Sequence, residues 1–182
     1  MTSTFDAASV KSFAPFEALT SEEASAVARL LEVQSLPKGE VLFREGDASD
    51  TIYMIASGEM DISIKVPNHD DHHLVTFGSG AIFGEVAPLA GERRSATVKA
   101  LTDVTLARLP WATLESALKS GETWASKFLL GTAKTLARRL RIVDSQLASM
   151  LAQIDACAPE RMIKTEDELD RLRTRLLQEW SF

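Results

Sequence analysis

The segment from Phe83 to Ala100, FGEVAPLAGERRSATVKA, contains the residues with the clearest chemistry in this sequence. A glycine, an acidic residue and a short run of Ala and Leu predict one helical turn whose free backbone N–H groups favour an anion. Arg94 follows this turn, and a guanidinium can hold two oxygens of a phosphate side by side. Glu85 is a suitable acceptor for sugar hydroxyls. Together these residues predict a site for a sugar phosphate or a nucleotide.

Short β-rich runs within residues 33–109 must position this segment. Gly39, Gly46, Gly58 and Gly80 lie between the runs, where a tight turn requires a positive φ. Runs of this length separated by turn signals are typical of an all-β sandwich or barrel. The runs are VLFREGD, TIYMIASGEMDISIKV, HLVTFGSG, SATVKA and VTLARLP.

Helices are predicted on both sides of the β region. Residues 15–32 combine Thr20 and Glu23 in a capping-box pattern with an apolar stripe, which predicts a short amphipathic helix. After Pro110 the segment WATLESAL predicts a second helix.

A longer helix is predicted from about Glu122 to Ile154. Its apolar residues follow one another at alternating steps of four and three, which is a heptad seam. We expect this seam to join two copies of the chain in a homodimer; the alternative is that it packs on the chain's own β region. Together with Ala133, the expected dimer-interface residues are Leu129, Leu136, Leu140, Val143, Leu147, Met150 and Ile154.

The composition narrows the choice of partners. Of the 182 residues, 26 are Asp or Glu and 20 are Lys or Arg, and the net charge of −6 opposes binding to nucleic acid or anionic lipid. The single Cys157 cannot form an internal disulfide, which favours a reducing compartment. The sequence has no apolar run of about 18 residues and no secretory signal, so we expect a cytoplasmic protein with no membrane partner.

The segment described first resembles the phosphate-binding cassette of the cyclic nucleotide-binding domain family. The family pattern is Phe-Gly-Glu, eight residues, then Arg, a small or hydroxyl residue and Ala. In this sequence the pattern is filled by Phe83, Gly84, Glu85, Arg94, Ser95 and Ala96. The resemblance extends over roughly 13–155. It implies a mainly β fold with α, an eight-stranded jelly-roll β-barrel flanked by an N-terminal helix and long C-terminal helices.

The sequence predicts four parts of the chain. Residues 1–14 are expected to be an N-terminal extension, and 15–122 the cyclic nucleotide-binding jelly roll with its N-terminal helix. Residues 123–158 are the expected dimerisation and lid helix. Pro159 is expected to end it, and the tail 159–182 carries a further amphipathic helix.

The resemblance also implies roles for individual residues. Arg94 would bind the exocyclic phosphate oxygens of cAMP or cGMP, and Glu85 would accept from the ribose 2′-OH. The backbone of Gly84, Glu85, Val86 and Ala87 would donate to the phosphate or the sugar. The alternative for Glu85 and Arg94 is a salt bridge that closes one end of the barrel.

Two further positions concern the base of the nucleotide. Val75 is expected to form part of an apolar wall against the base. Ser95 stands where the family associates a Thr with contact to guanine and an Ala with preference for cAMP. A serine therefore does not decide between adenine and guanine as the base of the ligand. Pro88 lacks one backbone donor in the cassette, which is tolerable at a helix start.

Other functions are less well supported. His69, His72 and His73 are expected in a solvated polar loop, so no metal site is predicted. The sequence has no kinase signature, phosphate-binding glycine loop or catalytic triad, and we expect no catalytic residue, no enzyme activity and no cofactor. Only the 28 residues of 155–182 follow the seam, too few for a helix-turn-helix domain.

The sequence therefore predicts a stand-alone cyclic nucleotide receptor that signals to an unidentified partner protein by rearranging its helices. The alternative is a ligand-free adaptor of the same fold that acts through its C-terminal helix.

Overall fold

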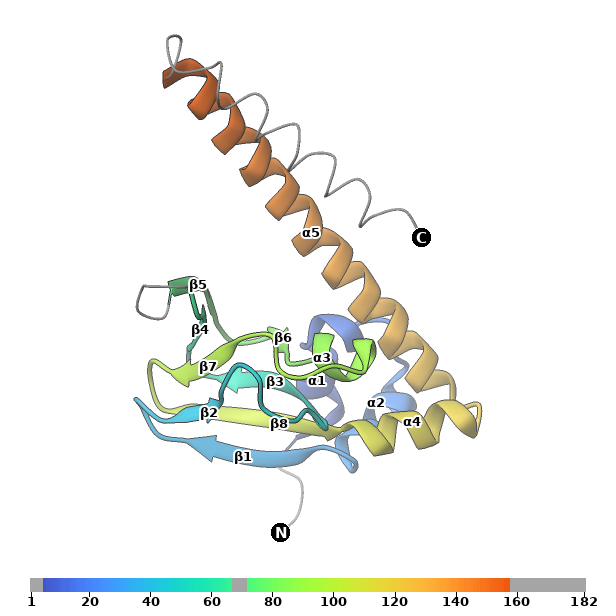
Figure 1. Ribbon diagram of the computed structural model, residues 1–182. Coiled ribbons are helices and arrows are strands. Elements are labelled where there is room, and N and C mark those ends of the chain that lie inside the picture. The colour runs from blue at the N-terminus through green and yellow to red at the C-terminus, as the bar shows by residue number, and fades with distance from the viewer. Residues whose placement is uncertain (1–4, 67–71, 158–182) are drawn as a thin grey trace. The chain divides into compact units, whose positions relative to one another are not determined.

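The computed structural model describes residues 5–66 and 72–157 (Figure 1). The chain divides into two units, Met1–Leu136 and Ala137–Phe182. All the strands of the described residues belong to the first unit. They are β1 (Glu32–Leu36), β2 (Val41–Phe43), β3 (Thr51–Ser57), β4 (Met60–Ile64), β5 (His72–Phe77), β6 (Ile82–Phe83), β7 (Thr97–Ala100) and β8 (Val104–Pro110).

The strands form two antiparallel sheets of four, in the orders β1-β8-β3-β6 and β2-β7-β4-β5. The eight strands of the predicted mixed fold are therefore present among the described residues. Strand pairing does not join one sheet to the other in this part of the chain, so the expected closed barrel is replaced by two separate sheets. Strand β6 has only two residues, too few to pair with more than a short piece of β3.

Strand β3 shows how the sequence builds two cores at once. Successive side chains of a strand point to opposite faces. Tyr53 and Ile55 belong to the core between the two sheets. Ile52 and Met54 belong to a second core that the helices cover. The run TIYMI is therefore buried along its whole length, as the burial of every residue from Thr51 to Ile55 shows.

Helices of the first unit cover the outer face of the β1-β8-β3-β6 sheet. The shared core contains Val10 and Phe13 from the N-terminal region, Leu114 from the helix after β8, and Phe128 from the long helix. The helices of the described residues are α1 (Ala7–Lys11), the 3₁₀ helix η1 (Ala14–Phe16), α2 (Ser21–Ala28), α3 (Val86–Ala90), α4 (Trp111–Lys119) and α5 (Thr123–Cys157), and α5 continues from the first unit into the second.

The N-terminal helices differ in part from the expectation. Residues 15–32 were expected to form one helix, but α2 ends at Ala28 and β1 begins at Glu32. The segment 1–14, the expected N-terminal extension, contains α1, and Val10 and Phe13 within it are buried. Helix α1 has only five residues, which is too short for an apolar period to be recognised in sequence.

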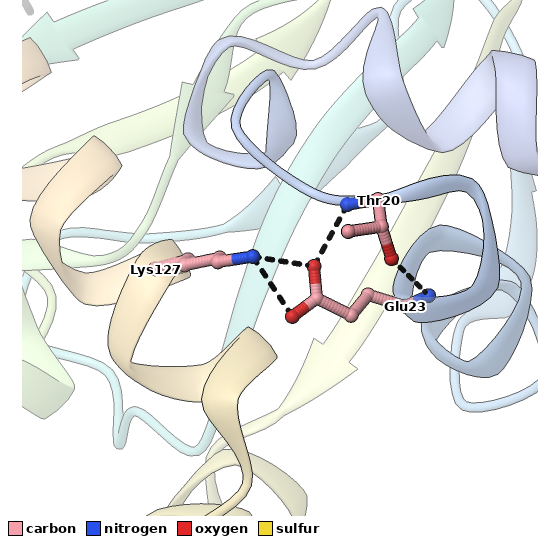
Figure 2. Close-up of polar contacts among 3 residues, drawn as sticks. All are labelled: Thr20, Glu23 and Lys127. Carbon is pink, nitrogen blue, oxygen red and sulfur yellow. Dashed lines mark hydrogen bonds and ion pairs between the residues drawn. The ribbon is translucent and has the colours of Figure 1, made fainter.

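The predicted capping box is confirmed at the start of α2, and Figure 2 shows its contacts. The Thr20 N–H donates to Glu23 Oε2 at 2.7 Å, and the Glu23 N–H donates to Thr20 Oγ1 at 3.2 Å. The same carboxylate accepts from Lys127 Nζ of α5 at 2.9 and 2.7 Å. Glu23 therefore stabilises its own helix and also ties α2 to the first turns of α5.

Close packing joins the start of α5 to the N-terminal segment. The rings of Phe16 and Phe128 lie 4.7 Å apart between centroids. Gly131 lies against the backbone of Pro15, and a Cβ on Gly131 would stand 2.5 Å from the Pro15 carbonyl oxygen. Only glycine fits at this contact.

The long helix follows the prediction in its length, but its first turns bury a different face from the expected seam. Trp124 and Phe128 are buried in the helical core, whereas Leu129 is only partly buried. In the second unit, the seam residues Leu140, Val143, Leu147 and Met150 are 46 to 60% exposed. The Ile154 side chain, Pro159 and the tail lie outside what the structure describes. Across 5–66 and 72–157, no helix has the length and apolar character needed to span a membrane.

Candidate functional site

The candidate site begins where β6 ends. Gly84 follows Phe83 with a φ of +74°, a conformation that side chains disfavour. A Cβ at Gly84 would also lie 2.6 Å from Nη1 of Arg94, closer than such atoms approach. Gly84 is therefore favoured for two reasons: its backbone has a positive φ, and the Arg94 side chain occupies the space that a Cβ would need.

Arg94 lies in the loop between α3 and β7, and the loop after β2 holds its backbone. The Arg94 N–H donates to the Asp47 carbonyl at 2.9 Å, and the Gly46 N–H donates to the Arg94 carbonyl at 2.8 Å. This two-bond pairing fixes the residue from which the side chain enters the molecule. Gly46 takes the predicted positive φ, +87°, in this turn.

The Arg94 side chain is buried, with 4% of the residue exposed. Its Nη1 donates to the Gly84 carbonyl and its Nη2 donates to the Thr51 carbonyl, each at 2.8 Å. Its Nε is also buried and has no hydrogen-bond partner among the described residues. A guanidinium has five N–H donors, so the two carbonyls leave part of its capacity for another acceptor.

Aromatic rings surround this guanidinium. Its central carbon lies 4.2 Å from the centroid of the Phe43 ring and 5.5 Å from that of Tyr53. The Phe43 and Tyr53 rings are 5.8 Å apart, and Tyr53 stacks on Phe83 at 5.5 Å. The three rings come from β2, β3 and β6, so the site forms only when both sheets are assembled.

The electrostatic surroundings of Arg94 are unusual for a buried cation. None of the ion pairs among the described residues involves Arg94. Burial lowers the pKa of the Arg94 guanidinium, and attraction to Tyr53 and to the carboxylates of Asp50, Asp47 and Glu85 opposes that effect. The direct salt bridge between Glu85 and Arg94, the alternative expected from sequence, is not among these ion pairs.

Glu85 and the residues after it form the start of α3. Glu85 is 1% exposed and is the N-cap of the helix. Val86 and Ala87 are the first two helical residues, whose N–H groups have no partner within a helix. Pro88 has no N–H, so its place in the first turn of α3 removes only a donor that the helix would leave unbonded. Val86 is 44% exposed, and Ala87 is buried.

The structure brings together the main members of the expected site, but not all of them. Arg94 and Gly84 are in direct contact. Ser95 is exposed next to Arg94. Val75 lies on β5 opposite Ile62 of β4 and is 38% exposed, and the contacts described around Arg94 do not include it.

Sequence reasoning missed Phe43, Tyr53 and the carbonyl of Thr51. These groups lie 51, 41 and 43 positions before Arg94 in the chain. The alternation of buried residues in TIYMI indicates which face Tyr53 occupies, but no spacing within one strand indicates that an arginine from a distant loop lies on that face.

The histidines are placed differently from the expectation. His72 and His73 were expected in a polar loop, but they begin β5, where cross-strand pairing with β4 extends the hairpin. Both are exposed, and His73 Nδ1 contacts Asp61 Oδ1. His69 lies outside the described residues. Within those residues, no group of His, Cys, Asp and Glu has the arrangement of a metal site.

This arrangement favours an anionic group. A buried charge is costly unless it is paired or well hydrogen-bonded. Arg94 has backbone carbonyls and aromatic faces as neighbours, and a helix start lies beside it in the chain. The dipole of a single helical turn is small, so the guanidinium supplies most of the attraction.

Comparison with known proteins agrees with the geometry. Residues 33–120 match the family model described as "Cyclic nucleotide-binding domain". The chain is 35% identical over 94 residues to a cyclic nucleotide-gated potassium channel of Rhizobium etli, covering 52% of this chain and 25% of the channel. It is 33% identical over 106 residues to a cAMP-dependent protein kinase regulatory subunit of Eremothecium gossypii, covering 58% of this chain and 22% of that protein.

A solved structure shows the same fold. The catabolite activator protein of Thermus thermophilus matches with a TM-score of 0.67 and 26% identity, over 75% of this chain and 62% of that chain. The chain thus corresponds to a minor part of the two curated relatives. The family match includes Gly84 and Glu85, which follow β6, and Arg94, which lies in the loop before β7. Residues 33–120 of this chain belong to the cyclic nucleotide-binding domain family.

Proposed function

We propose that this chain is a receptor for a cyclic nucleotide, cAMP or cGMP, and that Arg94 binds the exocyclic phosphate. The observation that carries the proposal is the buried guanidinium of Arg94, which has no ion pair among the described residues and an Nε without a hydrogen-bond partner. A singly charged phosphodiester supplies the compensating charge and accepts from such donors. The family match of residues 33–120 supports the same ligand class.

The remaining contacts to the ligand follow from the same segment. Glu85 accepts from the ribose 2′-OH, and the backbone N–H groups of Gly84, Glu85, Val86 and Ala87 donate to the phosphate or the sugar. Val75 provides an apolar surface for the base. Ser95 is exposed next to Arg94 and leaves the choice between adenine and guanine open.

We further propose that ligand binding is read out through the helices. A ligand shifts the equilibrium between two arrangements only by its difference in affinity for them. The first turns of α5 pack on the N-terminal helices of the same unit through Phe16, Phe128 and the Glu23–Lys127 ion pair. A change in this packing would be transmitted along α5 to a partner protein. The role is regulatory and non-enzymatic, in the cytoplasm.

The exposed seam of the second unit supports a homodimer. Leu140, Val143, Leu147 and Met150 recur at heptad spacing and are exposed. An apolar seam at this spacing is the pattern that pairs two helices. We propose that two copies of the chain meet along this seam, which also includes Leu129, Leu136 and Ile154.

Calorimetric titration of the chain with cAMP and with cGMP tests the receptor function. Arg94→Ala is expected to weaken binding by about 10- to 150-fold, the effect of about 1.5–3 kcal/mol for a charged hydrogen bond. Arg93→Ala is the matched control, because Arg93 is an exposed neighbour whose side chain donates to the Gly46 carbonyl. If neither nucleotide binds the unmodified chain, the receptor function is rejected and the ligand-free adaptor takes its place.

A further inference from the structure

We propose that Phe43 is a positioning residue for the phosphate site: its ring holds the Arg94 guanidinium in the orientation that receives the ligand. This inference rests on the proposed function and deepens it. Phe43 acts through Arg94 and is therefore a positioning residue, not a ligand contact.

The geometry places the guanidinium carbon of Arg94 over the Phe43 ring. The guanidinium carbon is 4.2 Å from the Phe43 centroid, well inside the range of about 6 Å for a cation–π contact. The face of an aromatic ring is negative, so it attracts the cation without accepting one of its N–H groups. Phe43 therefore offsets part of the free-energy cost of burying Arg94 and leaves the N–H donors of the guanidinium for other partners.

The two hydrogen bonds to backbone do not fix the side chain alone. Nη1 and Nη2 bond to the Gly84 and Thr51 carbonyls, and both bonds lie at the outer end of the guanidinium. The group can still tilt about the line that joins these two nitrogens. The Phe43 ring, which lies against the guanidinium carbon, opposes this tilt, and the tilt is the motion that would redirect Nε.

The surroundings of Phe43 keep the ring itself in place. It packs on Tyr53 at 5.8 Å and on Phe83 at 6.2 Å between centroids, and it lies against the core between the sheets. Phe43 ends β2, and its backbone is paired with Val98 of β7. Because β7 begins three residues after Arg94, the same strand pair positions both the ring and the arginine.

The test replaces the ring by residues that change its π face more than its volume. Phe43→Leu is expected to weaken cyclic nucleotide binding by about 5- to 30-fold, the interval between an exposed and a desolvated cation–π contact. Phe43→Tyr keeps a π face and is expected to bind within about 3-fold of the unmodified chain. Stepwise fluorination of the Phe43 ring, which reduces the negative charge of its face at nearly constant volume, is expected to weaken binding progressively.

The control uses an aromatic pair distant from Arg94. The same fluorinated residues at Phe128, which packs on Phe16, change the core equally but are expected to leave affinity unchanged. A merely structural role for Phe43 predicts instead that Phe43→Leu lowers the melting temperature and that fluorination has no effect on affinity. That result overturns the proposal.

A second measurement needs no ligand. In a nuclear magnetic resonance spectrum, a ring at 4.2 Å shifts the Arg94 Nε–H proton upfield, and Phe43→Leu is expected to remove this shift. If the unmodified chain binds neither cAMP nor cGMP, the receptor function fails, and this signal still decides whether the ring holds the guanidinium. A resonance that Phe43→Leu leaves in place refutes the positioning role even if the chain binds a nucleotide.

Discussion

Replacing Gly84 by alanine tests the geometry of the site most directly. The new Cβ would lie 2.6 Å from Arg94 Nη1, and the backbone would keep a φ of +74°. The left-handed backbone alone costs roughly 1–2 kcal/mol for a residue with a side chain. The guanidinium must also move away, which breaks its bond to the Gly84 carbonyl and costs about 1.5–3 kcal/mol more. The expected total loss of stability is roughly 2.5–5 kcal/mol.

Gly91→Ala is a matched control for this change. Gly91 ends α3 with a φ of +71°, almost the value of Gly84, but a Cβ there meets nothing within 4 Å. The control should therefore lose only the backbone part of the stability, about 1–2 kcal/mol. It should keep its affinity for the ligand, because Arg94 stays in place.

Urea unfolding of both variants measures the two losses, and calorimetry measures the two affinities. Gly84→Ala should bind about 10- to 150-fold more weakly, as Arg94→Ala does, because both changes remove the guanidinium from its position. In an Arg94→Ala background, Gly84→Ala should cost no more than Gly91→Ala. If Gly84→Ala and Gly91→Ala prove equally stable and bind equally well, the close contact between Gly84 and Arg94 does not organise the site.

Three other predictions concern the rest of the molecule. The hydrogen bond from Lys127 is the largest cause of the lowered pKa of Glu23, so the contribution of Glu23 to the free energy of unfolding should be fully present above pH 4.5. It should be lost as the pH drops through the lower folded-state pKa, and in pH-dependent urea unfolding Lys127→Met should flatten this part of the fall. Light scattering should report a monomer for the double variant Leu140→Glu, Leu147→Glu. The control Ile142→Glu changes a residue that is exposed but outside the seam, and this variant should stay dimeric. A dimeric double variant would exclude the seam as the interface. A nucleotide at about 100 times its dissociation constant should add about 2.7 kcal/mol to the free energy of unfolding, and an unchanged melting temperature would contradict specific binding.

The β region could be predicted well from sequence because its signals are local. The positive φ values of Gly39, Gly46, Gly58 and Gly80 were expected from their places between β-rich runs, and all four are confirmed. Strand β6 was not singled out because two residues carry no alternation. The separation into two sheets also depends on pairing between distant strands, which a local pattern does not contain.

The candidate site divides in the same way. The cassette around Gly84, Glu85 and Arg94 is a single run with its own spacing, so its members could be named in advance. The rings of Phe43 and Tyr53 join Arg94 only after β2 and β3 have folded, so their relation to it is a property of the tertiary structure. The same reason explains the first turns of α5: the seam pattern is clear, but the face that the N-terminal helices cover is set by Phe16 and Pro15.

The contact between Gly131 and Pro15 limits how the long helix is able to move. A slide of one helical turn, about 5.4 Å, would bring a residue four positions away to Pro15. Those residues are Lys127 and Thr135, and each has a side chain where only a hydrogen fits. Gradual gliding of α5 along the N-terminal segment is thereby blocked. The start of α5 therefore either packs on Pro15 or separates from it, and the proposed signal through this contact would switch between two states without intermediate positions.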